Sequence, residues 1–282
     1  MQIQNISDTA LWVAEYRARE GDRPDAIVRD PFARRLAGER GAELARSLPG
    51  SGMEAVMALR TRVIDDLILE AISRERVDAV ISLAAGLDSR PFRLELPPDL
   101  RWVEVDLPPL LAYKQEKLAG ETPRCRYEAV ALDLADVEAR RALFTRLGAE
   151  VKSAFVLTEG LLVYLPAEAV TGLAQDLAAV PAFDFWAADV MGEDALKYMA
   201  RTYNTALKKG QARMQWALPA RGDFFGKLGW HEVSFASFVD LGRQYQREMP
   251  FSWLWDVFVW LAPEPKKQEL RRMSGIVLLE RA

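Results

Sequence analysis

A turn of small residues between two apolar segments is the stretch of this sequence best suited to bind a ligand. Residues 83–87 read Leu-Ala-Ala-Gly-Leu and follow the apolar run 77–81. Short side chains at such a turn let a ligand lie against the backbone at the carboxyl end of a parallel strand. We therefore predict that Ala84 and Gly86 belong to a cofactor site.

Asp106 indicates which ligand this site takes. It lies 20 residues beyond Gly86, the spacing at which doubly wound folds place a carboxylate against the hydroxyl pair of a ribose. The complete G-x-G-x-x-G pattern, which lets a backbone approach a pyrophosphate, is absent because Ala84 and Arg90 occupy part of it. The sequence therefore favours a nucleoside without phosphates, such as S-adenosylmethionine, over a dinucleotide.

Two more acidic residues, Asp133 and Glu159, follow predicted strands, and the carboxyl ends of parallel strands meet at one edge of a sheet. Asp133 with Leu134 suits an adenine, because the carboxylate can accept from the exocyclic amine while leucine covers the ring. Glu159 could hold an amino group, since a buried carboxylate needs a cationic partner. Arg60 could bind a carboxylate through its planar guanidinium group, and Arg62, two residues later, is the alternative.

The elements that would position these residues alternate between strand and helix from residue 77 onward, which predicts a parallel sheet covered on both faces. We expect strands at 79–83, 102–106, 127–132, 154–157 and 184–190, and an antiparallel pair, 231–235 and 275–280, at one sheet edge. We expect helices at 8–20, 54–74, 107–118, 137–147, 166–178 and 193–207. Another short helix should begin near Asp30, with Gly38 and Gly41 limiting its length.

Composition restricts the functional classes. The chain has 282 residues, half of them apolar, and a formal net charge of -4, which gives no attraction to nucleic acid. Its one cysteine, Cys125, and its one histidine, His231, leave no disulfide framework and no cluster for zinc. No secretory signal or membrane-spanning stretch is visible. We expect a cytoplasmic protein without a metal, and the sequence leaves monomer and homodimer open.

Four strings of residues carry a resemblance to the leucine carboxyl methyltransferase family. They are LAAGLDSRPFRL at 83–94, WVEVDLP at 102–108, the stretch 132–135, and FVLTEGLLVYLP at 155–166, with 58–67 before them. The similarity spans roughly residues 9–189. It implies an α/β class I methyltransferase (Rossmann-like) fold, with a seven-stranded sheet, N-terminal helices and a helical cap insertion.

On this basis we expect a single domain with four regions: an N-terminal helical region at 1–76, a cofactor-binding core at 77–190, a substrate cap at 191–228, and C-terminal strands with an aromatic segment at 229–282. The resemblance also implies roles in binding S-adenosylmethionine. Arg60 would bind the methionine carboxylate, Ala84 and Gly86 would form the turn, and Asp106 would bind the ribose. Asp133 and Leu134 would bind the adenine, and Glu159 would bind the amino group. The family usually has glycine where Ala84 stands.

The resemblance further implies methyl transfer to an oxygen, commonly that of a carboxylate. A carboxylate is ionised at neutral pH and needs no general base, whereas a hydroxyl would need one, for which His231 is the sole histidine. We expect Tyr164, Tyr203 and Arg213, together with Tyr198, to orient an anionic acceptor.

We therefore predict an S-adenosylmethionine-dependent O-methyltransferase acting on a small natural-product or polyketide intermediate. Three alternatives stay open. They are methylation of a protein C-terminal carboxylate, an NAD-dependent oxidoreductase, and a non-catalytic binding protein on the same scaffold.

Overall fold

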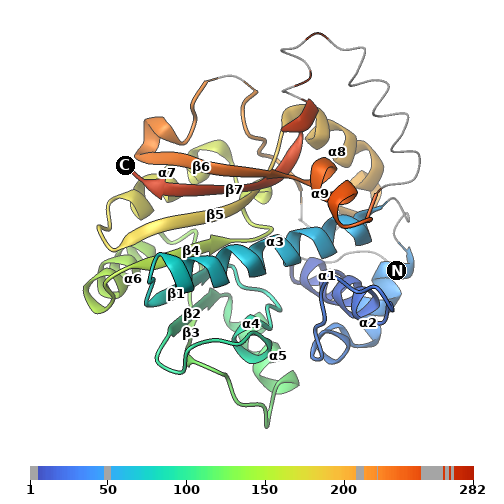
Figure 1. Ribbon diagram of the computed structural model, residues 1–282, viewed down its shortest axis with the longest axis horizontal. Helices are drawn as coiled ribbons and strands as arrows, with labels where there is room; N and C mark the ends of the chain where they lie inside the picture. The colour runs from blue at the N-terminus through green and yellow to red at the C-terminus, as the bar shows by residue number, and fades with distance from the viewer. Residues whose placement is uncertain are drawn as a thin grey trace.

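A seven-stranded sheet forms the centre of the computed structural model (Figure 1). The structure describes residues 6–47, 52–207, 213–220, 222–248, 263, 267 and 270–282, and only the backbone of 6, 7 and 202–207. The strands are β1 (Ala79–Leu83), β2 (Arg101–Asp106), β3 (Arg126–Ala131), β4 (Ala154–Thr158), β5 (Phe183–Met191), β6 (Trp230–Ser237) and β7 (Ser274–Arg281). They lie in the order β3-β2-β1-β4-β5-β7-β6.

The first five strands are parallel, and β7 runs antiparallel between β5 and β6. All seven predicted strands are therefore confirmed, including the antiparallel pair at the edge. All residues of β1 and β4 are buried, as expected for apolar strands at the centre of a parallel sheet. The strand order reverses between β1 and β4, and ligands of open α/β sheets bind at such a reversal.

Helices cover both faces of the sheet. Those of the described residues are α1 (Ile6–Gly21), α2 (Ala33–Ser47), α3 (Met53–Arg74), α4 (Arg90–Arg93), α5 (Pro108–Lys117), α6 (Val137–Glu150), α7 (Ala167–Ala178), α8 (Glu193–Leu207) and α9 (Phe238–Gln244), with 3-10 turns η1 (Leu162–Tyr164) and η3 (Gly226–Leu228). Helices α3 and α9 pack in one apolar cluster with the sheet, and α6 and α7 pack in another. Figure 1 shows α3 crossing the face opposite α6.

The helix after Asp30 is longer than predicted. Gly38 has φ 58° and ψ -171°, so it kinks α2, but the helix continues past Gly41 to Ser47. A Cβ on Gly41 would lie 2.6 Å from the Leu11 carbonyl oxygen, so this glycine permits the close approach of α1 to α2. The expectation that Gly41 limits the helix was wrong, because its small size serves packing between helices.

Within the part of the chain that the structure describes, no helix combines the length and apolar character that crossing a membrane requires. The predicted aromatic segment at 251–262 falls outside those residues.

Candidate active site

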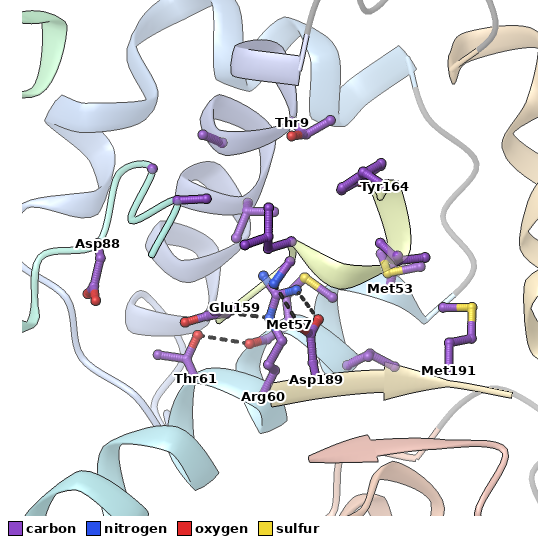
Figure 2. A pocket seen from close by; sticks show the side chains of 18 of the residues that line it. Thr9, Met53, Met57, Arg60, Thr61, Asp88, Glu159, Tyr164, Asp189 and Met191 are labelled. Atoms are coloured by element: carbon purple, nitrogen blue, oxygen red, sulfur yellow. Dashed lines mark hydrogen bonds and ion pairs between the residues drawn. The ribbon is translucent and has the colours of Figure 1, made fainter. Parts of the chain in front are cut away.

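A cavity of about 350 Å³ lies where the parallel strands end, at the lower end of the range for small-molecule sites, about 300–1,000 Å³. Ala84 to Asp88 after β1, Asp106 at the end of β2, Glu159 after β4 and Asp189 in β5 form its floor. Side chains from α1, α3 and α8 complete its walls. The cavity therefore lies at the strand-order reversal. Figure 2 shows side chains that line it.

The turn after β1 has the left-handed backbone that its small residues suggest. Ala84 has φ 53° and Gly86 has φ 56°. Glycine adopts this conformation freely, whereas another residue in it is destabilised by roughly 1–2 kcal/mol. Ala84 is thus a strained residue at a position where the family usually has glycine.

Asp106 is hydrogen bonded into this turn. Its carboxylate oxygens accept from the Gly86 amide at 2.6 Å and from the Leu107 amide at 2.7 Å. Burial raises the pKa of Asp106, against the lowering effect of these two amides. Each oxygen keeps acceptor capacity, so the side chain can both fix the turn and receive hydroxyl groups of a ligand.

Glu159 lies between two arginines. Its Oε1 is 2.9 Å from Nε of Arg60, and its Oε2 is 2.8 Å from Nη1 of Arg90. Burial alone would raise the pKa of Glu159, but attraction to Arg90 and Arg60 outweighs it and holds this pKa below its ordinary value. Asp189 completes the group, accepting from Arg60 Nη1 at 2.9 Å and from the Gly160 amide at 2.7 Å.

Arg90 anchors this network from behind. It is 2% exposed and also binds Asp65 at 2.6 Å and Asp88 at 2.9 Å. Burial would raise the pKa of Asp88, but Arg90 and Lys114 lower it to about 2. The second terminal nitrogen of Arg90 is buried and makes no hydrogen bond in the structure. This arginine therefore fixes Glu159 through a rigid set of charged contacts.

Helix α1 is tied to the turn as well. Arg17 donates to the Leu87 carbonyl oxygen at 2.6 Å and to Asp30 at 3.0 Å. The hydroxyl of Ser89 donates to the same Asp30 carboxylate at 2.7 Å. The N-terminal helices are thus joined to the cofactor turn by buried polar contacts, and Thr9 and Trp12 of α1 line the cavity.

The structure brings some of the predicted cofactor residues together and leaves others apart. Arg60 lines the cavity, whereas Arg62 pairs with Asp66 on α3 and does not line it. Asp133 is exposed, and its carboxylate accepts from the Ala135 amide in its own turn at 2.9 Å. Neither Asp133 nor Leu134 lines the cavity, so their role at adenine stays a prediction.

The predicted acceptor residues are also divided. Tyr164 lines the cavity, and burial raises the pKa of its phenol to about 12. Tyr198 lines it with 61% of its surface exposed. Arg213 and His231 are exposed and do not line the cavity, so the structure does not bring them to the site. The side chain of Tyr203 falls outside the described residues.

Sequence reasoning missed Asp189 and two groups of lining residues. Asp189 is the second-last residue of the fifth predicted strand, so a search at the carboxyl end of that strand could have found it. The first group consists of the charged residues Arg17, Asp88, Arg90 and Arg93. The second group consists of apolar residues on α1, α3 and α8 and in the segments near 214 and 273. These residues share no motif or spacing, and only the folded chain brings them together.

Comparisons with known proteins agree with this architecture. A Saccharopolyspora erythraea protein named as a candidate S-adenosyl-L-methionine-dependent methyltransferase is 34% identical over 248 residues, covering 81% of this chain and 84% of the relative. One from Mycobacteroides abscessus is 33% identical over 291 residues, covering 88% and 90%. A third, from a Parafrankia strain, is 39% identical over 188 residues, covering 63% of this chain but only 60% of the relative.

Two solved structures share the fold at low identity. A candidate methyltransferase from Thermobifida fusca has a TM-score of 0.58 at 14% identity, covering 99% of this chain and 95% of that one. A DUF574 family protein from Streptomyces avermitilis has a TM-score of 0.57 at 12% identity, covering 95% and 97%. The predicted class I methyltransferase fold is confirmed. Residues 10–178 match the family model described as leucine carboxyl methyltransferase, and the chain belongs to the leucine carboxyl methyltransferase family.

Proposed function

We propose that this methyltransferase transfers the methyl group of S-adenosylmethionine to an oxygen of a small-molecule acceptor. The acceptor would be a natural-product intermediate, with a carboxylate preferred over a hydroxyl. The observation that carries the proposal is the gathering of Asp106, Glu159 and Arg60 around one cavity at the strand-order reversal. Family membership supports methyl transfer, and the names of the relatives support the methyl donor.

The residues present fit that donor. Asp106 offers carboxylate oxygens for the ribose hydroxyls from a turn that its own hydrogen bonds fix. Arg60 and Glu159 offer one positive and one negative group, 2.9 Å apart, beside Gly160. An amino acid carries the complementary charges on its carboxylate and ammonium groups. Charge-assisted hydrogen bonds to both groups would therefore orient the methionine part.

Methyl transfer from this donor requires little activation of the acceptor. S-adenosylmethionine, when bound, supplies a methyl group already activated by its sulfonium, so the protein mainly has to align the acceptor oxygen and exclude water. A carboxylate acceptor is ionised at neutral pH and needs no base. With its pKa at about 12, Tyr164 keeps its proton at neutral pH and can donate a hydrogen bond to the acceptor.

The shape of the cavity favours a small molecule over a protein C-terminus. Its walls come from α1, α3 and α8 as well as from the strand ends, so lining residues face it from several sides. A volume of about 350 Å³ suits small ligands. Methylation of a protein carboxylate is the alternative, which a candidate peptide substrate would test.

The proposal is tested in two steps. Isothermal titration calorimetry with S-adenosylhomocysteine, the demethylated donor, should give one site per chain, and the absence of binding would overturn the proposal. Transfer of a labelled methyl group to a panel of small acids and phenols should then follow. Mild alkali releases the label from a methyl ester as methanol, whereas an aryl ether keeps it. Label found only on nitrogen would reject O-methylation.

A further inference from the structure

Methionine is concentrated in one wall of the cavity. The chain has eight methionines, and six of them line this cavity: Met53, Met57, Met191, Met199, Met214 and Met273. We call these six residues the methionine wall. They come from α3, β5, α8 and two further segments, so they meet only in the folded chain.

Aromatic side chains from separate parts of the core line the cavity together with the methionine wall. Met57 and Met199 are buried in one apolar cluster with Trp12, and Met53, Met191 and Met214 pack against that cluster. Trp216 and Phe238 line the same cavity. Figure 2 shows Met53 and Met191 on the side of Arg60 away from Asp88. The cavity thus has a charged end at the turn after β1 and an apolar end at the methionine wall.

Most of the charged lining residues lie at the first of these ends. The four arginines that line the cavity all pair with carboxylates: Arg17 with Asp30, Arg60 with Glu159 and Asp189, Arg90 with Asp65, Asp88 and Glu159, and Arg93 with Asp65. Among the described lining residues, none on the methionine side carries a charge beyond Arg60 and Asp189. A charged group on the far part of an acceptor would therefore be buried without an ionic partner.

Methionine also suits a particular kind of apolar ligand. Its side chain is unbranched and flexible, and its sulfur makes favourable contacts with the edges of aromatic rings. A wall of such side chains can adapt to rings of different shape, whereas leucine or phenylalanine would define a narrower space. The reacting oxygen would lie toward the charged end, where the cofactor residues are.

We propose that the methionine wall is the acceptor subsite and that it takes an apolar, ring-bearing body with no charge other than at the reacting oxygen. The inference rests on the proposed function, since it assigns the part of the cavity that the methyl donor leaves to the acceptor. It applies to an aromatic acid and to a phenol alike, because only the body of the acceptor contacts the wall.

Two probes of the same ring system test the inference. The protein saturated with S-adenosylhomocysteine is titrated by calorimetry with 2-naphthoate and with naphthalene-2,6-dicarboxylate, which carries a second carboxylate at the far end. We expect the dicarboxylate to bind at least about 50-fold more weakly, because its second charge would enter the wall without a partner. Equal affinities, or binding of neither probe, would overturn the inference.

A positive charge placed in the wall should reduce this preference. Met53 is half-buried at the start of α3, so Met53→Lys can place an ammonium there with its stem along the apolar surface. We expect this variant to bind the dicarboxylate about 10-fold more tightly than the unchanged protein does. Val233→Lys adds the same charge at a residue that is 52% exposed on β6, and it should change neither affinity.

The two proposals fail in different ways. If S-adenosylhomocysteine does not bind, the proposed function fails and the acceptor subsite fails with it. If it binds while Met53→Lys leaves the preference between the probes unchanged in a protein whose circular dichroism is native, only the acceptor inference fails. Binding of the donor product with a clear preference for 2-naphthoate supports both.

Discussion

The two ends of the cavity are built on different principles. At the charged end, Glu159 is held by two arginines, and Asp106 by two backbone amides. At the other end, the methionine wall consists of flexible apolar side chains. A fixed network suits a ligand that never changes, and flexible thioethers suit one that does. The contrast suggests that donor recognition is rigid and acceptor recognition is adaptable.

Removing the carboxylate at the end of β2 should have the largest effect on the rigid end. Asp106→Ala deletes both the carboxylate proposed to accept from the ribose hydroxyls and the hydrogen bonds that fix Gly86 and Leu107. Hydrogen bonds to a charged group contribute about 1.5–3 kcal/mol each, so S-adenosylhomocysteine should bind at least about 100-fold more weakly in calorimetry. A loss below 10-fold in a folded variant would remove Asp106 from the donor site.

A second substitution tests whether Arg90 acts through Glu159. Arg90→Lys keeps the charge but cannot span Asp65, Asp88 and Glu159 with one planar group. We expect about 30-fold weaker binding of S-adenosylhomocysteine and unchanged binding of 5′-methylthioadenosine, which lacks the amino-acid part. If both ligands weaken equally, Arg90 has only a structural role in the fold.

Asp133 offers a smaller and sharper test, because it is exposed and lies outside the cavity lining. If it contacts adenine as the sequence predicts, Asp133→Ala should weaken S-adenosylhomocysteine about 10-fold, the value of one good hydrogen bond. Asp136→Ala is the matched control in the same loop. It removes the N-cap of α6, which should destabilise the protein by about 1 kcal/mol without changing the affinity.

The turn after β1 contains backbone strain at Ala84 that a substitution can relieve. Ala84→Gly should stabilise the protein by roughly 0.5–1 kcal/mol, because relief of the left-handed backbone at φ 53° exceeds the added entropy of glycine in the unfolded chain. Thermal unfolding followed by circular dichroism measures the change. Gly86→Ala is the reciprocal variant and should destabilise, since its φ is 56°. A lower melting temperature for Ala84→Gly would contradict this account.

A change of pH should have the smallest of these effects on donor binding at the charged end. The pKa of Glu159 is held below its ordinary value by Arg90 and Arg60, against burial, so its negative charge persists at neutral and mildly acidic pH. Its contribution is lost only as the pH falls through that lowered pKa. Glu159 should therefore add no pH dependence to the affinity for S-adenosylhomocysteine between about pH 8 and pH 5.5, whereas Asp106, whose pKa is raised by burial, would be the first of the two to protonate as the pH falls. A tenfold decline across that window would place a different ionisation in control.

The same contrast explains how much the sequence predicts. Apolar runs such as that of β1 and the spacing of Asp106 from Gly86 are local signals, so the strands and most of the charged end could be read from the chain. Arg90 appeared only as a residue that interrupts a glycine pattern, because two of its three partners, Asp65 and Glu159, are distant in sequence. The methionine wall draws on positions from 53 to 273, and no local pattern connects them.

One consequence follows from the contacts of Arg17 and Ser89 with Asp30. They join the amino-terminal helix to the loop after β1, so docking of the helix completes the set of contacts that hold this loop. During synthesis the helix leaves the ribosome first and has to wait for residues made some seventy positions later. A version of the enzyme begun at β1 would therefore lack the contacts that hold this loop and should lose affinity for the methyl donor, although Arg60 is the only deleted residue expected to contact that ligand's charges.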